Sequence, residues 1–164
     1  SVHMRVSPHP MPTAATETLT AAPPCVCGRL RRASRALTQL YDDLMAPSGL
    51  RITQFSLLRT LAARGPQRIS DLAAAALLDR TALSRTLEPL AGLGLVRIAA
   101  GRDARTREVT LTRAGAAALA RATPHWERAQ ACVARQLGAQ QSQALIGLLR
   151  EVEALHPAPG QLTK

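Results

Sequence analysis

The stretch that decides the fold runs from Ser70 to Gly115 and reads SDLAAAALLDRTALSRTLEPLAGLGLVRIAAGRDARTREVTLTRAG. Two short helical patterns are separated by Asp79 and Arg80, and a turn at residues 93–96 leads into a strand. An arginine-rich tip at residues 101–107 precedes a second strand. This order is typical of a winged helix-turn-helix, in which a helix fits the major groove of DNA and a basic hairpin reaches the backbone or minor groove.

Size and charge are consistent with this interpretation. The chain has 164 residues, which predicts one domain with tails, and its 21 basic and 11 acidic side chains give a net charge of +10. Such a charge favours an anionic partner, although GC-rich coding also produces an arginine-rich composition. With one Phe, one Trp and one Tyr, stacking platforms for single strands are scarce, so duplex DNA is the better fit.

The sequence carries no sign of membrane insertion or export. No apolar run approaches the roughly 18 residues that span a bilayer, and the N-terminus lacks a signal-peptide pattern. We therefore expect a cytoplasmic protein with no membrane partner and with three reduced cysteines.

Hydrophobic periodicity and turn residues predict the remaining elements. Thr53, Ser70 and Thr112 are expected to cap helices, Arg68-Ile69 to form a minimal strand, and Pro89 and Pro124 to bend their helices. The expected helices cover residues 25–45, 53–64, 70–78, 81–91, 112–137 and 139–155, and the expected hairpin strands cover residues 95–99 and 108–111.

The terminal helices carry apolar stripes that have no partner inside the DNA-reading segment. Packing against a second subunit would cover them, and a two-fold homodimer would place two reading helices about 34 Å apart, one DNA turn. The alternative is a monomer whose terminal helices cover its own core. We favour the homodimer.

Several segments, taken together and in order, resemble the MarR family of bacterial transcriptional regulators over about residues 26–155. They are Thr53-Gln54-Phe55-x-Leu57-Leu58, Ile69-Ser70-Asp71-Leu72-Ala73, Asp79-Arg80-Thr81-Ala82-Leu83-Ser84-Arg85, Leu90-x-x-Leu93-Gly94-Leu95-Val96 and Asp103-x-Arg105-x-x-x-Val109-x-Leu111-Thr112-x-x-Gly115. The resemblance implies a mainly α fold with a small β-wing, a winged helix-turn-helix with N- and C-terminal dimerisation helices.

The expected organisation follows from this likeness. A flexible Pro-rich arm covers residues 1–24, and a MarR-like domain covers residues 25–157, followed by a tail at 158–164. Within the domain, the winged helix-turn-helix covers about residues 53–112 and the dimerisation helices cover about 25–46 and 113–155. The expected function is a sequence-specific, homodimeric repressor of a near-palindromic operator; a non-sequence-specific architectural DNA-binding protein is the alternative.

The residues expected to contact DNA lie at two helix starts and on the wing. Arg85 is suited to a bidentate contact with guanine, Ser84 and the methyl groups of Ala82 or Thr86 to thymine, and Arg105 either to DNA or to Asp103. The full expected set is Ser70, Thr81, Ala82, Ser84, Arg85, Thr86, Arg102, Arg105 and Arg107.

Release from DNA is expected through a ligand or through oxidation. The family commonly binds small aromatic carboxylates or phenols, which favours a ligand. The cysteine placement also resembles the two-cysteine, peroxide-sensing branch, which implies Cys27 as reactive, Cys132 as resolving on the other subunit and Tyr41 as hydrogen-bond donor; Cys25 lies beside Cys27. A structural role for Cys132 or a zinc site including His125 are further alternatives.

An enzyme is the rival class, and the sequence does not favour it. No nucleophile elbow, zinc-protease motif, phosphate loop or dinucleotide fingerprint is present, and no cofactor is expected. Asp42 and Asp43 are expected to lie on a solvated helix face.

Overall fold

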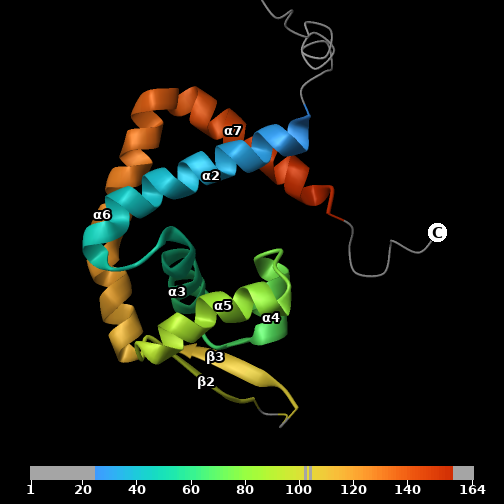
Figure 1. Cartoon of the computed structure of the whole chain (residues 1–164), viewed down its shortest axis with the longest axis vertical. Helices are drawn as coiled ribbons and strands as arrows, with labels where there is room; N and C mark the ends of the chain where they lie inside the picture. Colours follow the sequence, from blue (N-terminus) through green and yellow to red (C-terminus); the bar gives the residue numbers. More distant parts are fainter. Residues whose placement is uncertain (1–24, 102, 104, 157–164) are drawn as a thin grey trace, which may run out of the picture. The chain divides into compact units, whose positions relative to one another are not determined.

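The computed structural model describes residues 25–101, 103 and 105–156. The expected arm at residues 1–24, the tail at 158–164 and Arg102 lie outside the described residues. By its contacts the chain divides into two units, residues 1–36 and 37–164. Helix α2, Val26–Met45, spans the boundary between them (Figure 1). Its bounds confirm the helix expected from Cys25 to Met45.

Helix α3, Ile52–Arg64, follows the short 3-10 helix η1, Ala46–Ser48. The expectation that Thr53 caps this helix is wrong, because the N-cap residue is Arg51. Two side chains accept from amides at this helix start. Gln54 Oε1, within the first turn, accepts from the Arg51 N–H at 3.0 Å, and Asp42 Oδ1, from α2, accepts from the Ile52 N–H at 2.8 Å. Asp42 is therefore a capping residue supplied by α2, and the expected solvated role for it is wrong.

Two short helices follow, α4, Ile69–Ala75, and α5, Arg80–Gly92. Ser70 does not cap α4, since the N-cap residue is Arg68 and Ser70 lies inside the first turn. Asp79 caps α5 by accepting from the Ala82 N–H at 2.7 Å. Helix α5 continues past Pro89 to Gly92. Proline lacks an N–H and so removes one hydrogen bond of the helix, but its own carbonyl still accepts from the Leu93 N–H at 3.0 Å.

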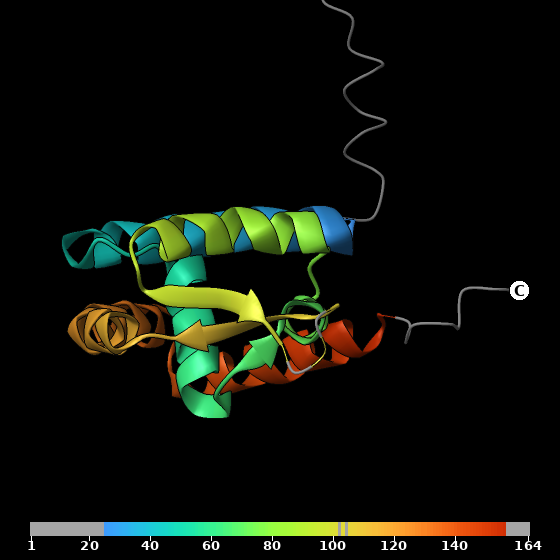
Figure 2. The same cartoon turned by 90° about the horizontal axis from the view of Figure 1, so that it is seen from below.

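Three strands form an antiparallel sheet in the order β1-β3-β2 (Figure 2). They are β1, Gln67–Arg68, β2, Val96–Ala100, and β3, Arg107–Leu111. The expected hairpin is confirmed, and the expected minimal strand is shifted by one residue because Ile69 already belongs to α4. Strand β3 pairs Val109 with both Gln67 and Ile98, so it is the centre of the sheet.

Helix α6, Arg113–Leu137, begins at the expected cap, where Thr112 Oγ1 accepts from the Gly115 N–H at 3.0 Å. The same hydroxyl donates to the Gly94 carbonyl at 2.7 Å, which ties the start of α6 to the start of β2. Gly115 lies so close to this turn that an added Cβ would meet the Leu95 carbonyl oxygen at 2.0 Å. Helix α7, Ala139–Ala154, follows α6 and packs against it.

The core of the second unit lies between α3, α5, the sheet and α6. Burying each large apolar side chain contributes about 1.5–3 kcal/mol, so this cluster supplies the main stabilisation. The largest fully buried side chains are Met45, Phe55, Leu58, Leu61, Leu72, Leu83, Leu87, Leu90 and Val109. Within the described ranges, none of the helices combines the length and hydrophobicity that crossing a membrane requires.

Candidate nucleic-acid interface

Helix α5 has an inner and an outer face. Leu83, Leu87 and Leu90 recur at helical spacing and are buried, so they fix the orientation of the helix. Thr81 and Arg85 are exposed and lie away from this buried stripe. The start of α5 therefore presents one hydroxyl and one guanidinium to solvent, a pairing suited to base edges and phosphates.

The other three α5 residues in the expected set do not share this exposure. Ser84, Ala82 and Thr86 are half-buried, and the last two line a cavity that separates α5 from α3. The Thr86 hydroxyl donates to the Ala82 carbonyl within the helix at 3.5 Å. The structure thus divides the expected reading set into an outward pair and a half-buried group.

The turn before α5 is held by backbone hydrogen bonds. The Leu78 N–H donates to the Ala73 carbonyl at 2.9 Å and the Leu77 N–H to the Ala74 carbonyl at 3.1 Å, the pattern of a helix C-cap. Such a cap needs a left-handed residue, and here that residue is Leu77, with φ of 50° rather than the usual glycine. Together with the Asp79 cap, this turn fixes the angle between α4 and α5.

The wing is the β2–β3 hairpin with its tip at residues 101–106. Gly101 N–H donates to the Thr106 carbonyl at 2.8 Å, and Thr106 N–H donates to the Asp103 carbonyl at 2.8 Å. An added Cβ on Gly101 would lie 2.5 Å from Thr106 Oγ1, so the tip closes tightly only with glycine there. These bonds connect Gly101, Asp103 and Thr106 across the end of the hairpin.

Asp103 and Arg105 interact, but not as an ion pair. The Asp103 carboxylate accepts from the Arg105 backbone N–H at 3.1 Å, an Asx turn, and the guanidinium is not its partner. Of the two alternatives given for Arg105, the structure therefore does not show the side-chain pair with Asp103, and the Arg105 guanidinium is exposed. Arg107, opposite Ala100 in the register, is exposed as well.

The positive charge of this surface is not neutralised internally. Among the described residues, the one ion pair joins Arg51 to Asp42 at 3.5 Å, far along the chain from α5 and the wing. A guanidinium keeps its charge at all physiological pH values, so these arginines are available to phosphates. Sequence analysis missed Arg80, exposed at the start of α5, and Arg97, exposed on β2. Neighbouring residues of a strand point to opposite faces of the sheet, so the apolar Val96 on the buried face could have predicted that Arg97 is exposed.

Ser70 and the expected sensor residues belong neither to α5 nor to the β2–β3 hairpin. Ser70 is exposed in the first turn of α4. Cys25 and Cys27 are exposed free thiols, and Cys132 is half-buried on α6. The Tyr41 hydroxyl donates to Gln130 of α6, and partial burial raises the pKa of this phenol. Within the described residues, no three His, Cys, Asp or Glu side chains gather as a metal site would require.

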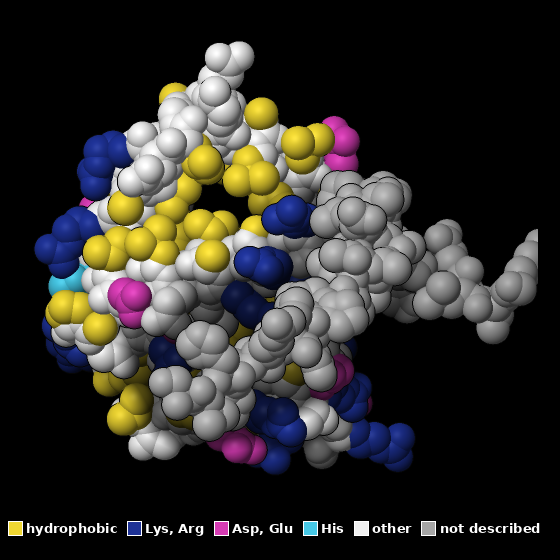
Figure 3. Space-filling view, turned by 45° about the horizontal axis from the view of Figure 1, so that its top comes forward, with side chains coloured by type: hydrophobic (Ala, Val, Ile, Leu, Met, Phe, Trp, Pro, Cys, Tyr) yellow, Lys and Arg dark blue, Asp and Glu magenta, His cyan; other side chains and the backbone are white. Residues whose placement is uncertain are grey.

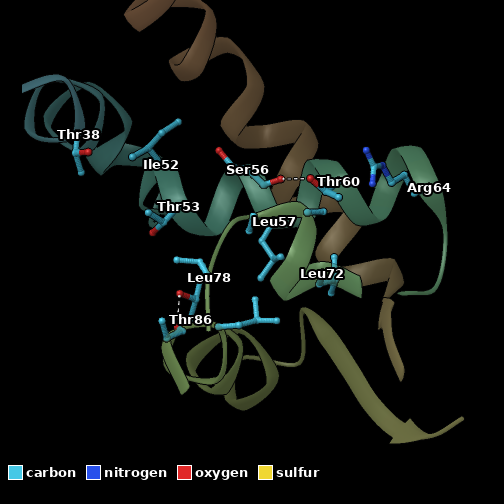
Figure 4. A pocket seen from close by; sticks show the side chains of 14 residues that line it. Thr38, Ile52, Thr53, Ser56, Leu57, Thr60, Arg64, Leu72, Leu78 and Thr86 are labelled. Carbon is cyan, nitrogen blue, oxygen red and sulfur yellow. Dashed lines mark hydrogen bonds between the residues drawn. The ribbon is translucent and has the colours of Figure 1, made fainter. Parts of the chain in front are cut away.

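A cavity of about 710 Å³ opens between α3 and the inner face of α5 (Figure 4). Leu57 from α3 and Leu78 from the turn before α5 lie between the two helices, and Thr86 approaches from α5. Arg64 stands at one end of the cavity, while Thr38 lies at the opposite end. No local pattern in the sequence indicates this cavity.

The fold and the basic reading surface define a winged helix-turn-helix protein, and comparisons agree. The MarR family model matches residues 50–101. MosR, a transcriptional regulator of Mycobacterium tuberculosis solved in complex with DNA, is 40% identical with a TM-score of 0.70, and the match covers 82% of this chain and 100% of that chain. The chain belongs to the MarR family.

Two further structures are similar over most of the chain. A probable transcriptional regulator from Pseudomonas aeruginosa is 26% identical, with a TM-score of 0.71 over 77% of this chain and 96% of that chain. BpsR of Bordetella bronchiseptica, whose DNA binding is regulated by 6-hydroxynicotinic acid, is 25% identical, with a TM-score of 0.71 over 79% of this chain and 94% of that chain. No curated protein matches the chain in sequence.

Proposed function

We propose that this protein is a sequence-specific, double-stranded DNA-binding transcriptional regulator that acts in the cytoplasm as a repressor. The observation that carries the proposal is the set of exposed arginines on α5 and the hairpin, which make no ion pair within the described part of the chain. They lie beside the buried leucines that fix the inner face of α5. A relative that is 40% identical was solved in complex with DNA, which supports the same role here.

The outward residues of α5 are the proposed base readers. Arg85 donates to guanine O6 and N7 in the major groove, and Thr81 contacts phosphate or a base edge. Arg105 and Arg107 extend from the wing to the neighbouring backbone. The complete proposed set is Ser70, Thr81, Ala82, Ser84, Arg85, Thr86, Arg102, Arg105 and Arg107.

A homodimer is the proposed assembly. Helix α7 has no buried residue, although its sequence is rich in apolar side chains. Ile146 and Leu148 are 52% and 59% exposed, and Figure 3 shows hydrophobic side chains (yellow) on the face where α6 turns into α7. Burying apolar surface of this kind is favourable, and a second copy related by a two-fold axis would bring the same face to cover it. A two-fold pair would suit a near-palindromic operator.

The first experiment is a gel-shift titration of labelled upstream DNA with excess random duplex as competitor. The proposed function expects one near-palindrome to be retained, whereas an architectural protein would be displaced equally by any duplex. Arg85→Ala is expected to weaken binding by roughly 1–3 kcal/mol and to relax preference at one base pair. Arg121→Ala, which removes an exposed arginine from α6, is the matched control. Unchanged discrimination among operator variants would exclude Arg85 from base reading.

Release is proposed to follow binding of a small aromatic or phenolic ligand or oxidation of cysteine. Either effector must prefer a conformation that does not fit successive major grooves. Adding organic peroxide and then reductant to the gel shift tests the thiol route with Cys25, Cys27 and Cys132 each changed to Ser. Release that survives all three changes excludes a thiol switch and leaves the ligand route.

A further inference from the structure

We propose that Glu88 of α5 determines sequence specificity by accepting a hydrogen bond from the N4 amino group of a cytosine in the operator. The inference rests on the proposed DNA-binding function and deepens it, because it names a base that the protein requires. Glu88 lies outside the set of DNA-contacting residues expected from the sequence, which contains hydroxyls, small apolar groups and arginines but no acid.

Glu88 lies on the outward face of α5, together with Thr81 and Arg85. Each residue of an α-helix turns by about 100°, so Arg85 is offset by about 40° from Thr81, and Glu88 by about 20° in the other direction. All three are exposed, whereas Leu83 and Leu87 lie on the opposite side and are buried. The packing that turns Arg85 outward therefore turns Glu88 outward as well.

The separation of Arg85 and Glu88 along α5 is close to one step of the DNA duplex. Three residues at about 1.5 Å each give a rise of about 4.5 Å along the helix axis. Successive bases of a strand are about 3.4 Å apart. Both side chains can therefore meet base edges in one short stretch of the major groove. With Arg85 at guanine O6 and N7, Glu88 reaches a cytosine in the same or the next base pair.

The carboxylate of Glu88 has no ionic partner inside the fold. It forms no ion pair with Arg85, three residues earlier, or with any other cation that the structure describes. It has no capping role either, because Asp79 caps the start of α5 and Glu88 lies well inside the helix. Its oxygens are thus available to a hydrogen-bond donor on another molecule.

The charge of Glu88 decides which base can bind it. Phosphates repel a carboxylate along the whole duplex, so Glu88 weakens every complex in which no donor meets it. In the major groove, cytosine offers a donor at N4 and adenine offers one at N6. Adenine also places its acceptor N7 beside the amino group, which repels a carboxylate, whereas cytosine presents only the donor. A carboxylate therefore selects cytosine, and it does so partly by penalising the other sequences.

Selection of bound duplexes from a random library by the intact protein, followed by fluorescence-anisotropy titration of single-base variants, tests the inference. We expect cytosine to be preferred by about tenfold at one position of each recognised half-site. This position should lie within one base pair of the guanine whose preference Arg85→Ala removes. Glu88→Gln should shift the preference there to adenine, since an amide donates to N7 and accepts from N6. Glu88→Ala should remove it and leave the remaining positions unchanged.

Affinity for random duplex separates base reading from a structural role. Without the carboxylate the repulsion from phosphates is lost, so both Glu88 variants should bind random duplex about threefold more tightly than the wild type. Gln and Ala are good helix formers, so α5 should be retained in both. Glu127→Gln removes the same charge from an exposed position on α6 and is the matched control. It should leave the random-duplex affinity within about twofold and every base preference unchanged.

A cytosine preference that survives in both Glu88→Gln and Glu88→Ala would overturn the inference. Glu88 variants that bind random duplex no more tightly than the wild type would also overturn it. In either case a base preference that Arg85→Ala removes would leave the DNA-binding function standing. A wild-type protein that enriches no sequence from the library would instead refute the proposed function itself, and the reading role of Glu88 with it.

Discussion

The guanidinium of Arg59 lies over the indole of Trp126, with 4.7 Å between Cζ and the ring centroid. Phe55 stacks on the same indole, with ring centroids 5.6 Å apart. Because Arg59 and Phe55 belong to α3 and Trp126 to α6, this group joins α3 to the long helix α6.

Replacing Arg59 with Ala removes the cation from the indole face. We expect the free energy of unfolding to fall by about 0.5–1 kcal/mol, the usual contribution of an exposed cation–π contact. Trp126 is the single tryptophan of the chain, so its fluorescence during urea unfolding measures the change directly. Arg121→Ala should leave both the emission and the midpoint unchanged, and an equal response of the two variants would contradict the role of the stack.

Asp42→Ala tests the cap that α2 supplies to α3. The Ile52 N–H loses its acceptor, so the free energy of unfolding should fall by about 1–2 kcal/mol. Little of this loss is assigned to the Arg51 ion pair, because the arginine is 77% exposed. Asp43→Ala, which removes only a contact with Gln39, serves as control in chemical denaturation. A loss at Asp43 as large as that at Asp42 would refute the capping role.

Two glycines in helices should respond in opposite ways to alanine. At Gly115 the new Cβ would meet the Leu95 carbonyl at 2.0 Å, so Gly115→Ala should destabilise the fold by roughly 1–3 kcal/mol or more. At Gly147 nothing beyond the neighbouring residues and backbone of its own helix lies within 4 Å of the added Cβ, so Gly147→Ala should add up to about 1 kcal/mol through helix propensity. Thermal unfolding compares them, and a shift of the same sign in both would contradict the close approach at Gly115.

Leu77→Gly should stabilise the protein. The left-handed backbone at Leu77 costs an ordinary residue about 1–2 kcal/mol, which exceeds the roughly 0.5–1 kcal/mol of extra chain entropy that glycine loses. The expected net gain is about 0.5–1 kcal/mol by thermal unfolding. Ala74→Gly, inside α4, should destabilise by up to about 1 kcal/mol. A loss of stability in Leu77→Gly would show that the leucine side chain contributes more than the strain costs.

The raised pKa of Tyr41 leads us to expect a loss of stability at alkaline pH. Desolvation raises the pKa of the folded phenol, so the folded state keeps its proton longer than the unfolded state. The stabilising effect is complete below the unfolded pKa of about 10 and is lost as pH rises through the folded value. As the single tyrosine, Tyr41 can be titrated by ultraviolet absorbance, and its midpoint should lie higher in native protein than in urea. Coincident midpoints would contradict the burial effect.

The order of elements could be predicted because periodicity and turn residues are local signals. The caps could not, since Asp42 satisfies the first turn of α3 from a different helix and Arg68 rather than Ser70 precedes α4. Likewise, the sequence indicated which residue types start α5, but only packing decides that Arg85 faces outward and Thr86 faces a cavity. A cavity is the space left by several elements, and no local pattern encodes it.

Strand β3 hydrogen-bonds to β1 on one side and β2 on the other, so residues 69–95 start and finish against the same strand. Helices α4 and α5 both lie within this segment, which is anchored to the sheet at both ends. Arg68 and Val96, which flank this segment, are both paired with β3, so we expect the opening of the two helices to be coupled. Amide hydrogens of α4 and α5 should consequently exchange with solvent at similar rates.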